Sequence, residues 1–174
     1  IAYVSHPDFD PGPLLDAESA GAGDALEADP GQPLLDRVVA ETYPPGSTFK
    51  IITLAAALEN EIAGPDSLFD DPVEFDLPGS TATIRNFDRG TCAGGGQVEL
   101  RTAFARSCNT VFADLGIQVG ADALVGQAEA FGFASSIPFI YDVVPSAIPA
   151  AENFVNNEAA LGQSAIGQRD VRAT

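Results

Sequence analysis

The chain has 174 residues, a length typical of one domain, and 45% of them are hydrophobic, which is enough to form a buried core. Its formal net charge of −17 argues against a nucleic-acid partner and against docking on an anionic membrane through this segment, because both surfaces are negatively charged. The chain begins at Ile1, contains no methionine and has no apolar run that could span a bilayer, and we expect it to be a piece of a longer protein.

The N-terminal part of the chain is expected to hold a strand and two helices. Residues 1–4 predict a short strand, and the Gly-, Ala-, Asp- and Pro-rich residues 11–31 predict a loop or a partly ordered insertion. Residues 32–42 have the pattern of a short amphipathic helix or turn. After a Pro-Pro-Gly break, residues 47–64 predict a helix that ends at Gly64. Apolar residues lie nearly all round this helix, so it is expected to be central and buried.

The middle of the chain changes from strand-like to helical patterns. Residues 72–77 and 81–87 predict short strands, and the glycine-rich residues 91–97 predict a flexible connection. Residues 98–116 have apolar side chains at helical spacing. A break is expected at the Ser-Cys-Asn segment within them, because serine and asparagine compete for helix hydrogen bonds.

The C-terminal part predicts one helix and a long irregular segment. Residues 121–133 form an amphipathic pattern that Gly132 closes. Residues 135–174 are punctuated by prolines and predict a loop, with a helix beginning near Asp170. The whole pattern predicts a helix-rich single domain with minor strands.

Ser47 and Lys50 form an S-x-x-K pair at the predicted start of the helix, and Lys50 is the only lysine of the chain. At this spacing both side chains lie on one helix face, and the free amides of the first turn favour negative charge near Ser47. A serine hydroxyl needs a base to become a nucleophile, and lysine can be that base when its pKa is lowered, whereas arginine cannot lose its proton. The alternative is a helix cap beside a solvent-facing lysine, and by itself the pair is a weak signal.

A second pair, Ser107 and Asn109, lies two residues apart, so both side chains can point the same way. A hydroxyl and an amide in this arrangement can relay a proton to a leaving group and hold a substrate amide. The alternative is an ordinary loop serine and asparagine that bind backbone groups.

Other kinds of catalytic site have little support in the sequence. The only histidine, His6, lies in a Pro- and Asp-rich segment and is expected to be a solvated loop residue, which argues against a Ser-His-Asp triad. Two cysteines are too few for a zinc site, and no metal-binding or phosphate-binding motif is present. We therefore expect no metal and no cofactor.

The segments "STFK" (Ser47–Lys50) and "SCN" (Ser107–Asn109) together resemble the first two active-site motifs of penicillin-binding proteins, the serine transpeptidases. The resemblance runs nearly from end to end, since the segments "IAYVSHPDFDP", "PLLDRVVAETYPPGSTFK", "AFGF" and "GQSAIGQRDVRAT" are also similar to parts of this family. The similarity is greatest to the actinobacterial class B group.

The resemblance implies an α+β fold, the penicillin-binding and serine β-lactamase-like transpeptidase fold. Residues 1–174 would be the N-terminal part of a single transpeptidase domain, namely its mostly helical half plus the first strand of a five-stranded antiparallel sheet. The third family motif, K-T-G, cannot occur in this chain because Lys50 is its only lysine. The remaining strands and the K-T-G motif are therefore expected on a C-terminal segment, without which the catalytic site is incomplete.

The activity that the resemblance implies is a D,D-transpeptidase that cross-links peptidoglycan stem peptides at D-Ala-D-Ala and is acylated by β-lactams. Ser47 would be the nucleophile, with its amide as an oxyanion donor, and Lys50 would be the general base. Ser107 would pass a proton to the leaving group, and Asn109 would position the substrate amide and the lysine. Ser47, Ser107 and Asn109 would contact the substrate.

The resemblance also implies where the protein works and with what. The expected partners are stem peptides, β-lactam antibiotics and other cell-wall or divisome proteins. The expected location is the extracytoplasmic face of the plasma membrane, with an anchoring N-terminal helix that is not part of this chain.

Two alternative functions are compatible with the same motifs. A serine β-lactamase or β-lactam sensor shares them, and a class A β-lactamase would in addition need a glutamate that activates water; Glu152 and Glu158 are the candidates. A catalytically inactive scaffold for cell-wall assembly is the alternative of another class, although the four intact motif residues argue against it.

Because the family faces an oxidising exterior, the resemblance further predicts a disulfide between Cys92 and Cys108. It would pin the turn of Ser107 and Asn109. The alternative is a pair of reduced, partly buried thiols.

Overall fold

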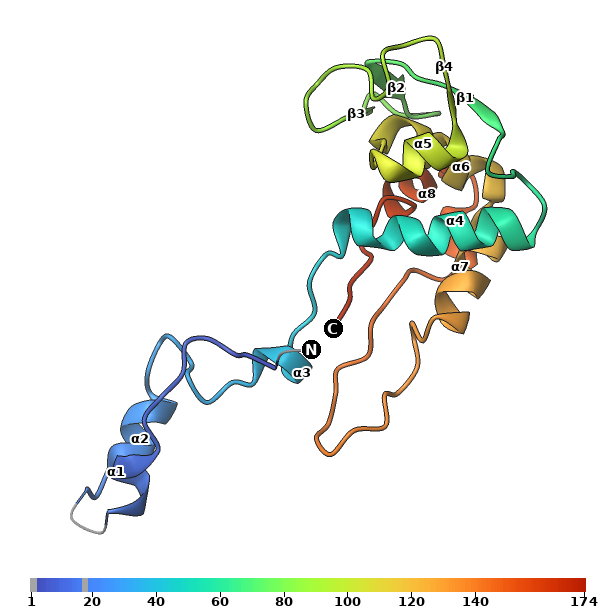
Figure 1. Ribbon diagram of the computed structural model, residues 1–174. Helices are drawn as coiled ribbons and strands as arrows, with labels where there is room; N and C mark the ends of the chain where they lie inside the picture. The colour runs from blue at the N-terminus through green and yellow to red at the C-terminus, as the bar shows by residue number, and fades with distance from the viewer. Residues whose placement is uncertain (1–2, 17–18) are drawn as a thin grey trace.

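The computed structural model describes residues 3–16 and 19–174, which form a helical body and an extended N-terminal arm (Figure 1). The arm contains α1 (Gly12–Leu15) and α2 (Ala22–Glu27) and leads to α3 (Arg37–Ala40). The first two helices lie where the sequence predicts a loop or a partly ordered insertion. Alanine, leucine and glutamate favour helix in α2. Helix α1 has Pro13 in its first turn, where the missing N–H costs no hydrogen bond.

The strand predicted over residues 1–4 is not seen in the described part of the chain. Ile1 and Ala2 lie outside the described residues, and Tyr3 and Val4 are irregular and exposed. Within the described ranges, no backbone hydrogen bond joins Tyr3 or Val4 to a neighbouring segment. A strand requires such a partner, which explains why an apolar, β-like pattern is insufficient here.

The predicted helix over residues 47–64 is shorter and less buried than expected. It opens with a 3₁₀ turn, η1 (Gly46–Phe49), continues as α4 (Lys50–Glu59) and ends well before Gly64. Its end is set by Glu61, whose φ of +55° is left-handed. One face of α4 is buried, whereas Ile51 and Leu58 on the opposite face are about half exposed. The helix is therefore central but covered on one side only.

The core of the body lies between four helices. Helix α6 (Asn109–Val119) packs against α4, against α7 (Ala121–Ala130) and against α8 (Glu158–Ser164) (Figure 1). Buried apolar side chains of these helices fill the interior; they include Ile52, Val111, Phe112, Leu115, Leu124 and Leu161. Helix α7 ends just before Gly132, as the sequence predicts. Within the described ranges, no helix has the length and the apolar character that crossing a bilayer requires.

The break predicted at the Ser-Cys-Asn segment is confirmed. Helix α5 (Leu100–Ala105) ends there and α6 begins at Asn109. Ser107 has a φ of +58°, and its amide and that of Cys108 donate to carbonyls of α5, which closes the helix end. This turn directs the next residues back toward α4.

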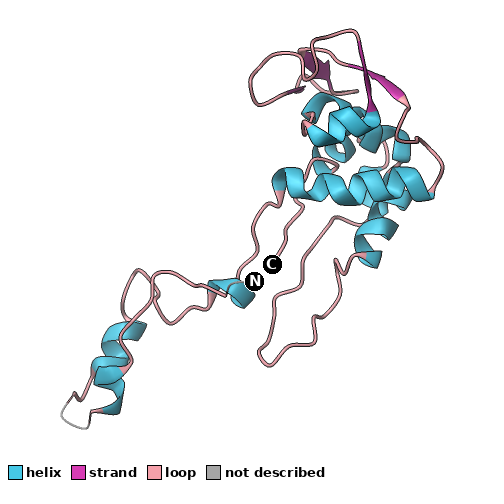
Figure 2. Cartoon of the chain, in the orientation of Figure 1, coloured by secondary structure: helices cyan, strands magenta, loops and turns pink. Residues whose placement is uncertain are grey.

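Four short strands form two antiparallel pairs at one end of the body (Figure 2). The strands predicted around residues 75 and 84 are confirmed as β2 (Glu74–Asp76) and β3 (Thr83–Arg85). The other pair, β1 (Leu68–Asp70) and β4 (Gln97–Glu99), was not predicted, and β4 begins at the end of the glycine-rich connection. Each strand has only three residues, too few for a distinct alternating pattern.

The C-terminal part differs most from the sequence prediction. Helix α8 lies in the segment predicted as loop, whereas residues near Asp170 form no helix. Instead, Arg172 and Ala173 are extended and bridge to Ala147 and Tyr43. Helix α8 has seven residues, too few for its apolar residues to show a clear helical periodicity in the sequence. It depends on close contact with α6, where a Cβ at Gly116 would lie 2.0 Å from the Cβ of Ala165. The small glycine thus permits α8 to lie against α6.

Candidate active site

Ser47 lies in η1, directly before α4, and its side chain is exposed. The preceding Gly46 has a φ of +56°, and its amide donates to the carbonyl of Gly167 over 2.9 Å. This bond ties the turn that carries Ser47 to the segment after α8. The N–H of Ser47 belongs to the first turn of the helix, where amides have no intrahelical acceptor, so it is available to an anionic group.

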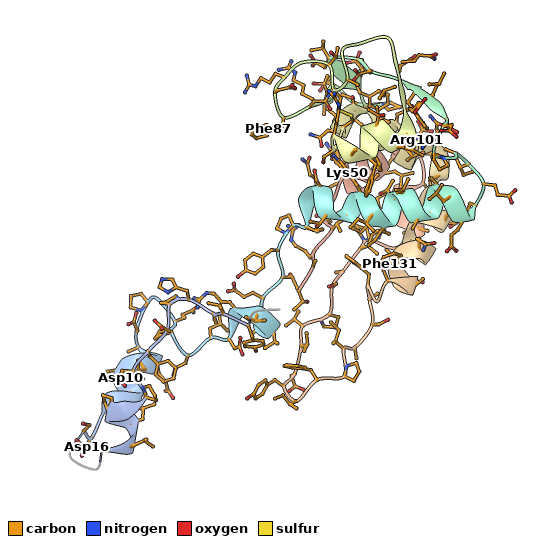
Figure 3. The ribbon with its side chains drawn as sticks, in the orientation of Figure 1. Asp10, Asp16, Lys50, Phe87, Arg101 and Phe131 are labelled. Carbon is orange, nitrogen blue, oxygen red and sulfur yellow. A yellow bond between two sulfur atoms is a disulfide. The ribbon has the colours of Figure 1, made fainter. Side chains whose placement is uncertain are left out.

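Lys50 lies three residues after Ser47 and is almost completely buried, with 1% of its surface exposed. Its Nζ donates to three oxygens: the carbonyl of Ser107 at 2.6 Å, Oγ of Ser107 at 3.0 Å and Oδ1 of Asn109 at 2.7 Å. The ring of Phe112 lies below it, with 5.7 Å from Nζ to the ring centroid. The structure thus brings three of the four predicted residues into one hydrogen-bonded group, which joins the start of α4 to the turn before α6. Figure 3 labels Lys50 in this group.

Burial lowers the pKa of Lys50 to about 8, because an ammonium ion loses its hydration in the interior. A solvent-facing lysine would keep its ordinary value, and this was the alternative interpretation of the sequence. Among the described residues, the hydrogen bonds of Nζ go to Ser107 and Asn109 rather than to Ser47. Catalytic hydrogen bonds often tighten only when substrate binds, so this geometry is compatible with proton transfer from Ser47.

Asn86 holds Asn109 in place, and sequence reasoning missed this residue. Its Oδ1 accepts hydrogen bonds from the amides of Asn109, at 2.8 Å, and of Thr110, at 3.3 Å. The side-chain Nδ2 of Asn109 donates to the carbonyl of Arg85 over 2.9 Å. Asn86 and Arg85 come from the end of strand β3, so this hairpin contacts the start of α6 directly. A single asparagine in a strand-like pattern cannot be recognised as such a partner without the fold.

Cys92 and Cys108 form a disulfide that joins the glycine-rich loop to the turn before α6. A cross-link of this separation, 16 residues, stabilises a fold by about 3 kcal/mol in the chain-entropy model. Asp71 fixes the same loop: it is 2% exposed and accepts hydrogen bonds from the amides of Cys92, Ala93 and Gly95. Burial alone would raise the pKa of Asp71, but these amides and the charge of Arg106 outweigh it and hold the pKa low.

A cleft of about 470 Å³ opens beside these residues. Its lining contains the predicted Ser47, Ser107 and Asn109, together with Asn86, Cys92, Arg106 and the residues 87 and 88. Phe87 is fully exposed at this cleft and projects from the edge of the body (Figure 3). The cleft therefore offers an exposed hydroxyl, a polar wall and an apolar edge to a ligand.

The other residues that the sequence analysis considered for catalysis do not line the cleft of Ser47. Glu152 and Glu158 line a second cavity, of about 800 Å³, with Ile117 and Asp122, and not the cleft of Ser47. His6 lines a hollow with Arg37 and other residues of the arm region, also apart from the cleft. Within residues 3–16 and 19–174, no group of three or more His, Cys, Asp or Glu side chains could hold a metal ion.

Comparison with known proteins places this geometry in a family. The model of the penicillin binding protein transpeptidase domain matches residues 1–174. The chain belongs to this family. The two motifs of the site therefore lie in a transpeptidase domain, and the chain has the α+β fold of this family.

Two relatives carry the name peptidoglycan D,D-transpeptidase, and one of them is similar over the whole chain. Peptidoglycan D,D-transpeptidase PbpA of Mycolicibacterium smegmatis is 46% identical over 182 residues, which cover 100% of this chain and 35% of the relative. Peptidoglycan D,D-transpeptidase MrdA of Escherichia coli K12 is 30% identical over 133 residues, or 76% of this chain and 20% of the relative. The chain thus spans 35% of the length of the mycobacterial protein.

A solved structure agrees with this assignment. The imipenem acyl-enzyme complex of penicillin-binding protein A from Mycobacterium tuberculosis matches with a TM-score of 0.90 at 43% identity. The match covers 100% of this chain and 40% of that one. The arm, the body and their arrangement are therefore those of a penicillin-binding protein.

Proposed function

We propose that this chain is the N-terminal part of a D,D-transpeptidase domain that cross-links peptidoglycan stem peptides through an acyl-enzyme on Ser47. The observation that carries the proposal is the buried Lys50, whose Nζ contacts Ser107 and Asn109 beside the cleft that Ser47 lines. The names of the relatives and the acyl-enzyme complex of the mycobacterial structure support it. The rest of the domain, with the K-T-G strand, would complete the substrate-carboxylate site and the oxyanion hole.

The proposed acylation begins with neutral Lys50, which takes the proton of Ser47 as Oγ attacks the carbonyl of the D-Ala-D-Ala bond. The negative charge on the carbonyl oxygen is stabilised by the free amide of Ser47. Ser107, at 3.0 Å from Nζ, relays the proton from Lys50 to the departing D-alanine nitrogen as the C–N bond breaks. The product is an ester between Ser47 and the stem peptide.

The ester is then resolved by an amine of a neighbouring stem peptide. The amine nitrogen forms a new bond to the carbonyl, the ester bond breaks, and the proton of the amine returns to Ser47 through the same residues. Asn109 holds Lys50 through Oδ1 and would orient the substrate amide. A β-lactam would acylate Ser47 in the same way, with cleavage of the ring C–N bond. Its leaving nitrogen stays attached to the acyl group and hinders attack by the incoming amine, so the ester would persist.

We also propose that the domain works outside the cytoplasm, because the proposed substrate is peptidoglycan. The Cys92–Cys108 disulfide supports such an oxidising location. The proposed partners are stem peptides, β-lactams and other proteins of cell-wall assembly.

A serine β-lactamase or sensor is the second candidate, and it differs in how the acyl group leaves Ser47. The position of Glu152 and Glu158 in a separate cavity gives no support to a water-activating role for either. An inactive scaffold, in contrast, would not be acylated. Formation of the ester separates a transpeptidase from an inactive scaffold, and the lifetime of the ester separates it from a β-lactamase.

The proposal is tested by locating the acyl group. Because a transpeptidase should form a persistent ester on Ser47, the protein at the full length of its mycobacterial relatives is expected to carry one penicillin adduct on the Ser47 peptide. Mass spectrometry after digestion identifies the peptide, and repeated sampling measures the loss of the adduct. Release of hydrolysed penicillin without an adduct that lasts long enough to be sampled indicates a β-lactamase. An adduct on another peptide, or neither an adduct nor hydrolysed penicillin, contradicts the proposal.

The pH dependence of acylation follows from the pKa of Lys50, which burial lowers to about 8. The base form is the neutral amine, so its fraction rises with pH: about a tenth of the molecules have it at pH 7, and most have it above pH 8. The second-order rate constant for acylation by a chromogenic cephalosporin is expected to rise up to tenfold per unit below pH 8 and then level off. A rate that falls between pH 6 and 8 would contradict a basic role for Lys50.

A further inference from the structure

Three hydrogen-bonding groups of Asn109 have partners outside α6. Its backbone amide donates to Oδ1 of Asn86, its Nδ2 donates to the carbonyl of Arg85, and its Oδ1 accepts from Nζ of Lys50. The second contact decides the orientation of the side-chain amide. Since Nδ2 must face the Arg85 carbonyl, Oδ1 must face Lys50.

Asn86 is well suited to hold this arrangement. It is only 6% exposed, and its Oδ1 accepts from two amides in the first turn of α6, those of Asn109 and Thr110. Its Nδ2 donates to the carbonyl of Gly90 over 3.1 Å, which fixes the orientation of its own side chain. Asn86 thus caps a helix from outside it, whereas Cys108, the residue at the N-cap position of α6, makes no side-chain cap hydrogen bond.

We propose that Asn86 is a positioning residue for the Ser47 acylation reaction: it fixes the first turn of α6, and thereby holds Asn109 against Lys50. The proposal rests on the proposed transpeptidase function and adds a residue outside its two motifs. Asn86 also lines the cleft, but it acts through Asn109 rather than on the scissile bond. Loss of its Oδ1 would free the start of α6, while the proton-transfer residues themselves remain.

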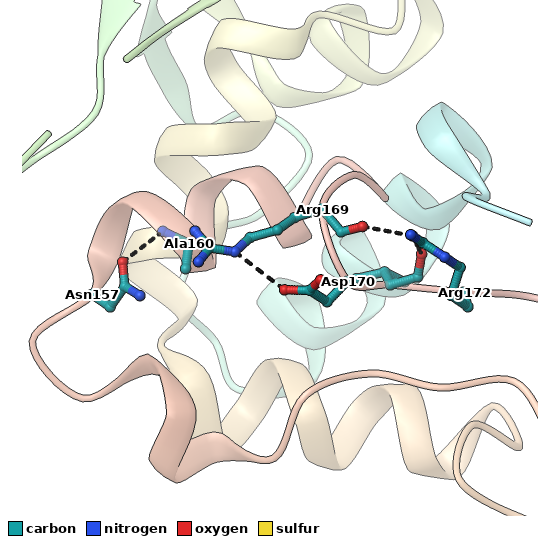
Figure 4. Close-up of polar contacts among 6 residues, drawn as sticks. Asn157, Ala160, Arg169, Asp170 and Arg172 are labelled. Carbon is teal, nitrogen blue, oxygen red and sulfur yellow. Dashed lines mark hydrogen bonds and ion pairs between the residues drawn. The ribbon is translucent and has the colours of Figure 1, made fainter. Parts of the chain in front are cut away.

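The test compares Asn86→Ala with two further variants in the protein at the full length of its relatives. Asn86→Asp keeps an oxygen that caps the helix, and a carboxylate is favoured at a helix N-terminus. Asn157→Ala is the matched control: Asn157 caps α8, where its Oδ1 accepts from the amide of Ala160 over 3.2 Å (Figure 4), and it does not line the cleft. Both alanine variants lose a helix cap, and Asn86→Ala should lose more thermal stability because it also loses the bond to Gly90, so acylation is compared at a temperature where both are folded.

Acylation should separate the variants. Because a misplacement of about 1 Å can cost about 100-fold in rate, we expect Asn86→Ala to lower the rate constant for acylation about 10- to 100-fold. Asn86→Asp should stay within about threefold of the wild type, and Asn157→Ala should be unchanged. The proposal is overturned if folded Asn86→Ala reacts at the wild-type rate, or if Asn157→Ala slows to the same extent. Should Asn86→Ala not fold, a tenfold or greater loss in folded Asn86→Asp overturns it.

A second measurement does not depend on acylation. Reaction of Lys50 with an amine-directed acylating reagent, followed by peptide mass spectrometry across a pH series, reports the ionisation of its Nζ. If Asn86→Ala turns Oδ1 of Asn109 away, the ammonium form loses an acceptor, and the midpoint should move to lower pH, but not in Asn157→Ala. If the wild-type protein is not acylated by penicillin, the proposed function fails. The midpoint of Lys50 ionisation still tests Asn86 in that case. A midpoint that is unchanged in Asn86→Ala overturns the positioning role.

Discussion

Replacement of Lys50 by arginine is expected to lower the rate constant for acylation of Ser47 by about 1,000-fold or more. General bases contribute about 10²- to 10⁴-fold, and an arginine side chain keeps its proton at any working pH. The substitution retains the positive charge beside Ser107 and Asn109, so the loss reports proton transfer rather than charge. The remaining rate should also no longer rise toward pH 8, because the group that titrates is gone.

The measurement is the rate of acylation by a chromogenic cephalosporin, with Arg101→Lys as the control. Arg101 is exposed, pairs with Asp66 on the surface and does not line the cleft, so the control exchanges one cation for the other without effect on the site. Thermal unfolding shows whether the larger guanidinium is accommodated. Acylation of Lys50→Arg at the wild-type rate would show that another group removes the proton from Ser47.

Residues whose role depends on local chain chemistry were predictable from the sequence. The S-x-x-K pair follows a Pro-Pro-Gly break through which a helix cannot continue. The 3₁₀ turn η1 begins at this break and leads into α4. The interruption between α5 and α6 follows from the Ser-Cys-Asn segment, whose serine adopts a positive φ. Strand β2 lies in a segment whose apolar residues alternate beyond the strand ends, at Val73, Phe75 and Leu77, and Phe75 pairs with Ile84 of β3.

Residues that act through contacts distant in the sequence were not predictable. Asn86 contacts Asn109 only because β3 lies beside the start of α6, and no periodicity indicates that approach. Helix α8 is too short to be recognised by its own pattern and is held by its contact with α6. The site thus consists of motif residues that the sequence identifies and supporting residues that only the fold identifies.

Gly167 is such a supporting residue, and Gly167→Ala is expected to reduce both stability and acylation. A Cβ at this position would lie 2.1 Å from the carbonyl oxygen of Gly46 and 2.8 Å from Cβ of Phe49. The φ of Gly167 is +68°, a conformation that costs an alanine about 1–2 kcal/mol. Added to overpacking of about 1–3 kcal/mol, the substitution should lower the free energy of unfolding by about 2–5 kcal/mol.

The effect on acylation follows from what the methyl group would move. The carbonyl of Gly167 accepts from the amide of Gly46, and Gly46 directly precedes Ser47, so relief of the clash shifts the turn that carries the nucleophile. A shift of about 1 Å should cost about 100-fold in the acylation rate, beyond any loss of folded protein. Gly126→Ala is the matched control: Gly126 lies within α7 with open space around its Cβ position, and alanine there should be neutral or slightly stabilising. If Gly167→Ala acylates as fast as Gly126→Ala at a temperature where both are folded, the packing of Gly167 against Gly46 does not position Ser47.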